Sequence, residues 1–202
     1  MKVLHLPYNI ASVISNSVYC LRNKGIDARG LAYTKLVTTN ADNLILLEDY
    51  YFDNAINRRI KQIKYAFVFH RMIKWADVLH YYWNADVLPF DLEFRYKKWY
   101  NKPAVVEFMG SEIRIPEVEY ADNPYYKMVM QQTNVKSEFS NLTNSERIQK
   151  KFSQQGFKVV TSPGMDTYLL PQYFKPPYHY LRSEEHTSEL QSPYVISYAV
   201  FC

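Results

Sequence analysis

The segment KVLHLPYNIAS, residues 2–12, joins a short apolar run to a polar turn that leads into a helical pattern. The run KVLHL is typical of a strand inside a parallel sheet, because such strands are covered on both faces. After the turn, Val13, Val18 and Leu21 lie near helical spacing, and Gly25 is the expected helix stop. A strand that turns directly into a helix predicts the first half of a β-α-β unit. The turn lacks the G-x-G-x-x-G pattern of dinucleotide-binding domains.

The same alternation of short apolar runs and longer helical patterns continues along the chain. Further strands are predicted at 26–34, 43–48, 78–83, 102–108 and 157–162. Further helices are predicted at 53–76, 90–101, 123–139 and 144–156. The clearest helical spacing, in steps of four, three and four, belongs to Ile56, Ile60, Ile63 and Phe67. The alternation predicts an α/β fold with a Rossmann-like, doubly wound parallel sheet.

The last residues of the chain, 182–202, have a different origin in our interpretation. Translated back into codons, Arg182 to Ser192 and Ile196 to Cys202 resemble the two constant segments of a short-read sequencing adapter. Such segments are set aside before fold reasoning. We therefore expect one domain over residues 1–181 and a non-native, adapter-derived tail over 182–202, with any following domain cut off at the read boundary.

Composition sets mild limits on partners and location. The chain carries 24 Lys and Arg against 20 Asp and Glu, a net charge of +4. Setting aside the tail, with its one Arg and three Glu, leaves 23 against 17, or +6. This charge is spread along the chain, and we expect no nucleic-acid partner. Without Cys202, Cys20 stands alone and suits a reducing compartment, so we expect a cytoplasmic location.

Polar residues follow the first predicted strand. In parallel α/β sheets, ligands bind at the carboxyl ends of the strands, near the point where strand order reverses. Asn9, Ser12 and Ser15 lie beside the unpaired N–H groups of a helix start and are candidate ligand contacts. The alternative is that Asn9 or Ser12 only caps the helix, as Asn and Ser ordinarily do.

Aromatic residues end the strand predicted at 78–83. Alternation along a strand sends His80 and Tyr82 to one face of the sheet, and Tyr81 and Trp83 to the other. We take Tyr82 and Trp83 as candidate contacts for a sugar ring. The alternative is that His80 and Tyr81 are core residues with internal hydrogen bonds.

A glycine–serine corner follows the strand predicted at 102–108. Gly110 permits close backbone approach or a positive φ, and the N–H groups of Gly110 and Ser111 are candidate donors to an oxyanion or phosphate. Glu112 is a candidate proton acceptor or hydroxyl ligand, and Arg114 a candidate partner for an anionic group. The alternative is a simple turn with a Glu112–Arg114 surface pair.

Five segments together resemble the N-terminal half of a GT-B glycosyltransferase of the family 4 type. They follow the family's order over most of residues 1–170: MKVLHLPYNIAS, LRNKGIDARGL, ADVLHYYW, VVEFMGSEIR and SERIQKKFSQQGFKVVTSPGMDTYL. The resemblance implies that this Rossmann-like domain receives a sugar or glycan acceptor. A C-terminal domain, beyond this chain, would bind the nucleotide-sugar donor through a Glu-containing motif. The fragment itself is then expected to hold no cofactor and to be inactive alone.

The resemblance also bears on individual residues. The turn from Asn9 to Ser12 matches the family's loop facing the cleft between domains, and Gly110, Ser111 and Glu112 match its frequent HGSD or HGSE segment. The family often has a His before that Gly, where this chain has Met109, whose thioether donates no hydrogen bond. We therefore assign no catalytic residue. GT-B enzymes are generally metal-independent, and the sequence has no D-x-D and no clustered His or Cys ligands.

Two alternative functions stay open. One is a non-catalytic α/β ligand-binding module, which predicts a native stop codon near Leu181. The other is a nucleotide-sugar epimerase with the same GT-B fold, which needs carboxylates for proton abstraction; Glu107 and Glu112 are the carboxylates in question.

The predicted helix 53–76 is also strongly basic. Its cations border the apolar stripe: Arg58, Arg59, Lys61, Lys64, Arg71 and Lys74. A solvated helix face is the ordinary interpretation of such charges. The alternative is peripheral contact with a membrane surface, at the inner face of the membrane, as expected for enzymes that act on lipid-linked acceptors.

Overall fold

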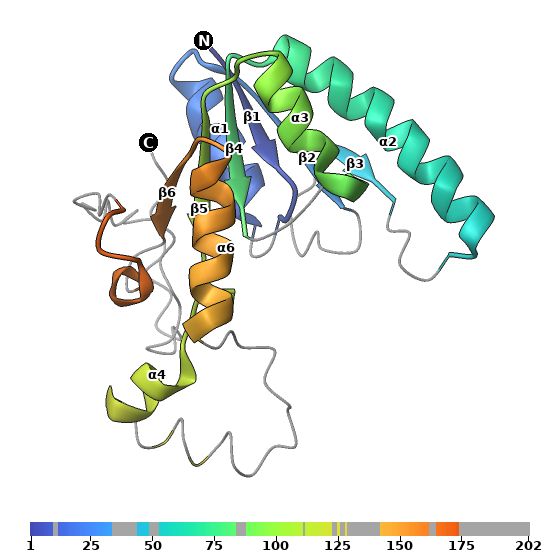
Figure 1. The fold of residues 1–202 in the computed structure, drawn as a ribbon. Coiled ribbons are helices and arrows are strands. Elements are labelled where there is room, and N and C mark those ends of the chain that lie inside the picture. Colours follow the sequence, from blue (N-terminus) through green and yellow to red (C-terminus); the bar gives the residue numbers. More distant parts are fainter. Residues whose placement is uncertain are drawn as a thin grey trace.

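The fold was determined from a computed structural model of the chain (Figure 1). The structure describes residues 1–9, 12–33, 44–48, 53–83, 88–110, 112–122, 125, 128, 142–161 and 165–173. Ser111 and the predicted helix 123–139, apart from Tyr125 and Met128, lie outside the described residues, as do the segments 174–181 and 182–202.

A six-stranded parallel sheet forms the centre of the domain. Its strands are β1 (Lys2–Leu6), β2 (Asp27–Tyr33), β3 (Leu44–Leu47), β4 (Val78–Tyr82), β5 (Ala104–Phe108) and β6 (Phe157–Thr161). They are ordered β3-β2-β1-β4-β5-β6, and every neighbouring pair is parallel. Strand order reverses between β1 and β4, which confirms the predicted Rossmann-like, doubly wound α/β class.

Helices cover both faces of the sheet. They are α1 (Val13–Asn23), α2 (Ala55–Trp75), α3 (Leu92–Trp99), α4 (Pro116–Asp122) and α6 (Leu142–Gln154), with short 3₁₀ turns at Pro89–Asp91 and Asp166–Tyr168. Figure 1 shows α2, α3 and α6 on one face and α1 on the other. The larger core, which includes Leu4, Tyr81 and Phe108, lies under α2, α3 and α6. A smaller core, which includes Val3, Ile14 and Tyr82, lies under α1.

Several helix boundaries follow local rules in the sequence. Gly25 and Gly156 have φ of 76° and 74°, and both come directly after helices, as predicted for glycine stops. Asn54 begins α2 by accepting a hydrogen bond from the backbone N–H of Asn57 at 2.9 Å. The short helix α4 was not predicted.

The apolar stripe of α2 lies on the side opposite to the sheet. The buried side chains of α2 are Tyr65, Phe69, Met72 and Ile73. The spaced residues Ile56, Ile60, Ile63 and Phe67 are exposed. The helix was therefore correctly predicted, but the stripe that predicted it does not pack on the sheet, although apolar stripes ordinarily do.

Cys20 lies in α1, and the second cysteine of the chain, Cys202, lies outside the described residues. Among the described residues, no helix is long and apolar enough to cross a membrane.

Candidate functional site

Apart from Ser111, which lies outside the described residues, the predicted site residues lie on segments that meet at one edge of the sheet, which we call the carboxyl edge. It is formed by the ends of β1, β4 and β5 at Leu6, Tyr82 and Phe108. Because these strands are parallel neighbours, the segments that follow them emerge side by side. The turn after β1 and the corner after β5 are separated by β4 alone, so they lie on the same edge as predicted. In Figure 1 this is the lower edge of the sheet.

Asn9 organises the turn after β1. Its side chain is fully buried, and Oδ1 accepts hydrogen bonds from the backbone N–H groups of Ile14 at 2.9 Å and Ser15 at 3.0 Å. Its Nδ2 donates to Ser15 Oγ at 2.8 Å. The Asn9 side chain thus serves the start of α1, as in the capping alternative, and these N–H groups do not point to a ligand.

Two residues near the carboxyl edge hold left-handed backbone conformations. Ser12, at the start of α1, has φ of 62°, and Trp83, directly after β4, has φ of 67°. Such conformations cost non-glycine residues on the order of 1–3 kcal/mol and gather at functional sites. Ser12 Oγ is buried and has no hydrogen-bond partner among the described residues. The strained residues lie at the start of α1 and directly after β4, beside the point where strand order reverses, which makes this the strongest candidate position for a ligand.

The Glu112 side chain bonds to the backbone of the corner after β5. Its Oε1 accepts a hydrogen bond from the Met109 N–H, and its Oε2 accepts one from the Gly110 N–H at 3.0 Å. The Gly110 N–H proposed for an oxyanion is therefore already bonded to a carboxylate of the same chain. Burial raises the pKa of Glu112 from 4.5 to about 7, against the lowering effect of these N–H groups and of Arg114. The carboxyl group can exchange a proton near neutral pH.

Arg114 lies over the same corner. Its backbone N–H donates to the Gly110 carbonyl at 2.9 Å, and its Nη2 lies 3.7 Å from Met165 Sδ. A Cβ built on Gly110 would stand 3.8 Å from Arg114 Nη2, an ordinary contact, and Gly110 does not have a positive φ. The expected backbone freedom of Gly110 is therefore not used. What the corner presents is a half-buried guanidinium group beside a buried carboxyl group.

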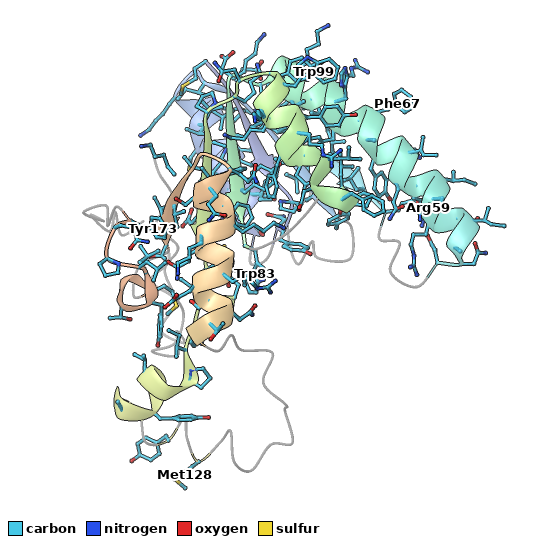
Figure 2. All side chains as sticks on the ribbon, in the orientation of Figure 1. Arg59, Phe67, Trp83, Trp99, Met128 and Tyr173 are labelled. Atoms are coloured by element: carbon cyan, nitrogen blue, oxygen red, sulfur yellow. The ribbon has the colours of Figure 1, made fainter. Side chains whose placement is uncertain are left out.

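Tyr82 lies inside the domain. It is fully buried beneath α1, and its hydroxyl forms hydrogen bonds with Ser17 Oγ at 2.9 Å and His5 Nδ1 at 3.2 Å. Burial raises its pKa well above the ordinary value, so it stays a neutral phenol. Trp83, by contrast, is half-buried at the carboxyl edge (Figure 2), and its backbone N–H donates to the Glu107 carbonyl at 3.0 Å. Of the two aromatic candidates, Trp83 alone remains placed to contact a ligand.

A polar group on the α1 face of the sheet contains His80, for which a core position was one alternative, and its grouping with His5 and Glu107 was not predicted. His5 and His80 occupy paired positions of β1 and β4, with ring centroids 5.2 Å apart. His80 Nε2 lies 3.2 Å from Glu107 Oε2 on β5. Burial, and then the charge of His80, lowers the pKa of His5 well below its usual range. The sequence signal was available: polar residues at matching positions of neighbouring strands on one face.

Comparisons with known proteins assign no family to this chain. No protein-family model matches the chain, and no curated protein matches it. Among solved structures, the chain is similar to a wide-type short-chain dehydrogenase/reductase from Veillonella parvula, in complex with NADP. The identity is 6% and the TM-score 0.39, over 79% of this chain and 67% of that chain. This likeness says nothing of what the present chain binds.

Proposed function

We propose that this chain is the acceptor-side domain of a nucleotide-sugar-dependent glycosyltransferase of the GT-B, family 4 type. The proposal rests on the ordered set of sequence segments that resemble this family. It is supported by the carboxyl edge, where the turn after β1 and the corner after β5 flank the end of β4. In this proposal a further domain carries the donor site, and the nucleotide sugar binds between the two domains.

The residues at this edge have distinct roles in the proposal. Glycosyl transfer requires an acceptor hydroxyl held in line with the anomeric carbon, while negative charge develops on the departing phosphate. Trp83 offers an aromatic surface to a sugar ring. The Arg114 guanidinium group lies 3.8 Å from the position of a Cβ built on Gly110. In this proposal it orients an anionic group of the acceptor or the departing phosphate.

Glu112 has a supporting role in this scheme. Its two oxygens hold the backbone at Met109 and Gly110, so it shapes the corner on which Arg114 lies. We do not assign it as a nucleophile or as the base that deprotonates the acceptor. It is also the best-placed carboxyl group for the epimerase alternative, because burial leaves its pKa at about 7.

The decisive experiment begins with the uninterrupted reading frame beyond residue 181. The encoded full-length protein is expressed and tested for release of nucleoside diphosphate from a panel of nucleotide sugars, with and without acceptor sugars. The proposal predicts a second Rossmann-like domain with a donor-site Glu, and acceptor-dependent release. A native stop codon near residue 181 would instead favour a non-catalytic binding module. Interconversion of sugar epimers without transfer would favour the epimerase.

A further inference from the structure

The outer face of α2 is an apolar surface exposed to water. Ile56, Ile60, Ile63 and Phe67 have exposed fractions of 72%, 59%, 60% and 73%. Their spacing places them in one stripe over about three helical turns. Figure 2 shows Phe67 on the side of α2 that points away from the sheet. We call these four residues the outer stripe.

The outer stripe is not needed for the fold of this domain. The inner face of α2 has its own set of buried side chains, Tyr65, Phe69, Met72 and Ile73, which join the main core. One apolar face of α2 already packs on the core, so the second apolar face, which is exposed to water, is an interaction surface.

The charges beside the outer stripe are all positive. Arg59, Lys64, Arg71 and Lys74 are exposed, and helical geometry places them on or beside the stripe. The sequence of α2 contains no Asp or Glu. The acidic partners Glu48 and Asp53 bind Lys61, which is less exposed than these four and lies off the stripe. The surface therefore combines apolar side chains with uncompensated cations, which favours an anionic partner.

An exposed tryptophan lies next to the same helix. Trp99, at the end of α3, is 75% exposed and stacks on Tyr100 with a centroid distance of 5.8 Å. The Tyr100 ring contacts His70 of α2 at 5.5 Å. Figure 2 shows Trp99 at the end of α3. Tryptophan favours the boundary between water and lipid, because its ring is amphipathic.

We propose that the outer stripe of α2, with Trp99 beside it, docks on an anionic lipid surface. In this arrangement the helix lies in the plane of the membrane, the stripe enters the headgroup boundary, and the four cations meet lipid phosphates and carboxylates. A second copy of this chain is a poorer occupant, since a twofold pairing brings the same cations against each other. Figure 1 shows α2 as an outer helix that extends beyond the sheet, which suits contact with a flat partner.

The test is co-sedimentation of the full 202-residue chain with lipid vesicles. One set of vesicles is phosphatidylcholine alone, and the other includes roughly one quarter phosphatidylserine, to supply the negative surface. The proposal predicts binding to the anionic vesicles at least about ten-fold stronger than to the neutral ones, and weaker binding as salt increases.

Three variants separate the contributions. The double variant I63S and F67S removes apolar contact and is expected to weaken binding at least about ten-fold. The variant K64Q and R71Q is expected to weaken it roughly 30-fold and to reduce its salt dependence. The matched control is the double variant Y19S and K24Q, which changes an exposed aromatic residue of α1 and the lysine at the end of that helix. It should bind the anionic vesicles as the unchanged chain does. Circular dichroism verifies that each variant is folded.

Three outcomes would overturn the proposal. The first is that the folded chain stays in the supernatant with anionic vesicles. The second is that the control variant loses as much binding as I63S and F67S. The third is a dimer in sedimentation velocity that dissociates in I63S and F67S, which would identify a second copy as the occupant of the stripe.

Discussion

At the scale of single residues, Asn9 links the first strand to the first helix. Its amide is fully buried, and it makes three hydrogen bonds with Ile14 and Ser15. Replacing Asn9 by Ala leaves the buried N–H groups of both residues unpaired. We expect N9A to lower the free energy of unfolding by about 2 kcal/mol in urea denaturation.

The matched control for N9A is Asn54, which caps α2 at an exposed position. Water replaces the lost bond there, so N54A is expected to cost about 0.5–1 kcal/mol. Equal effects of the two substitutions would contradict a special role for the buried amide at the β1 turn.

The burial of His5 is expected to lower the stability of the domain at acidic pH. Its pKa in the folded state lies well below the ordinary 6.5, because burial and then His80 disfavour the charged ring. As pH falls below 6.5, the unfolded chain takes up the proton first, so the folded state loses stability until the lowered pKa is reached. We expect H5N to have a shallower loss of stability than the parent chain between about pH 6.5 and 5. Urea unfolding across that interval measures this, and identical slopes would exclude His5 as the source.

Glu112 acts in the opposite direction. Burial raises its folded pKa from 4.5 to about 7, so between these values the unfolded chain is ionised while the folded chain keeps its proton. The neutral Glu112 side chain contributes its full stabilisation below pH 4.5, and this contribution is lost as the pH rises to about 7. The total loss in the free energy of unfolding is roughly 3 kcal/mol. The variant E112Q has no such titration and should not show this loss. If the free energies of unfolding of the parent chain and E112Q ran parallel from pH 4.5 to 7, the raised pKa of Glu112 would be refuted.

At the scale of elements, α2 has two apolar faces with different roles. Phe69 is fully buried, whereas Phe67, two residues earlier, is 73% exposed. We expect F69A to lower the free energy of unfolding by about 3–5 kcal/mol, and F67A to change it by no more than about 0.5 kcal/mol. Urea unfolding of the two variants checks the assignment of faces, and a larger loss for F67A would reverse it.

The periodicity of the sequence predicted which segments form helices and strands better than it predicted which of their faces are buried. The strands from 26–34 to 157–162 were predictable because apolar runs between turn residues are local signals. The helix at 53–76 was predictable for the same reason, yet its stripe faces outward, because spacing alone does not say which of two apolar faces meets the sheet. The helix α4 was missed because its seven residues are too few to show a period.

The candidate site was predicted in position but not in detail. The rule for parallel sheets brought Asn9 and Gly110 to one edge, which needs only strand order. The hydrogen bonds of Glu112 to the backbone beside it depend on a chain reversal that no periodic pattern signals. The positive φ of Ser12 and Trp83 was equally hidden, because neither residue type favours that conformation.

At the scale of the whole molecule, the two faces of the sheet are covered by different helices. One face carries α2, α3 and α6, and the main core lies beneath them. The α1 face carries the smaller core and the His5–His80–Glu107 group. Across both faces, the carboxyl edge is where backbone strain, a half-buried Trp83 and the cation Arg114 come together. This shared position supports the proposed acceptor role, which rests on the ordered sequence segments.

The most direct test of that role is a kinetic comparison in the full-length glycosyltransferase that we propose the reading frame through and beyond residue 181 encodes. We expect W83A to raise the acceptor KM at least about ten-fold and to leave the donor KM unchanged, because an aromatic contact to one substrate is removed. The control Y19A, on the exposed side of α1, should change neither value. A W83A enzyme with an unchanged acceptor KM, or with the donor KM raised instead, would contradict the assignment of the carboxyl edge to the acceptor.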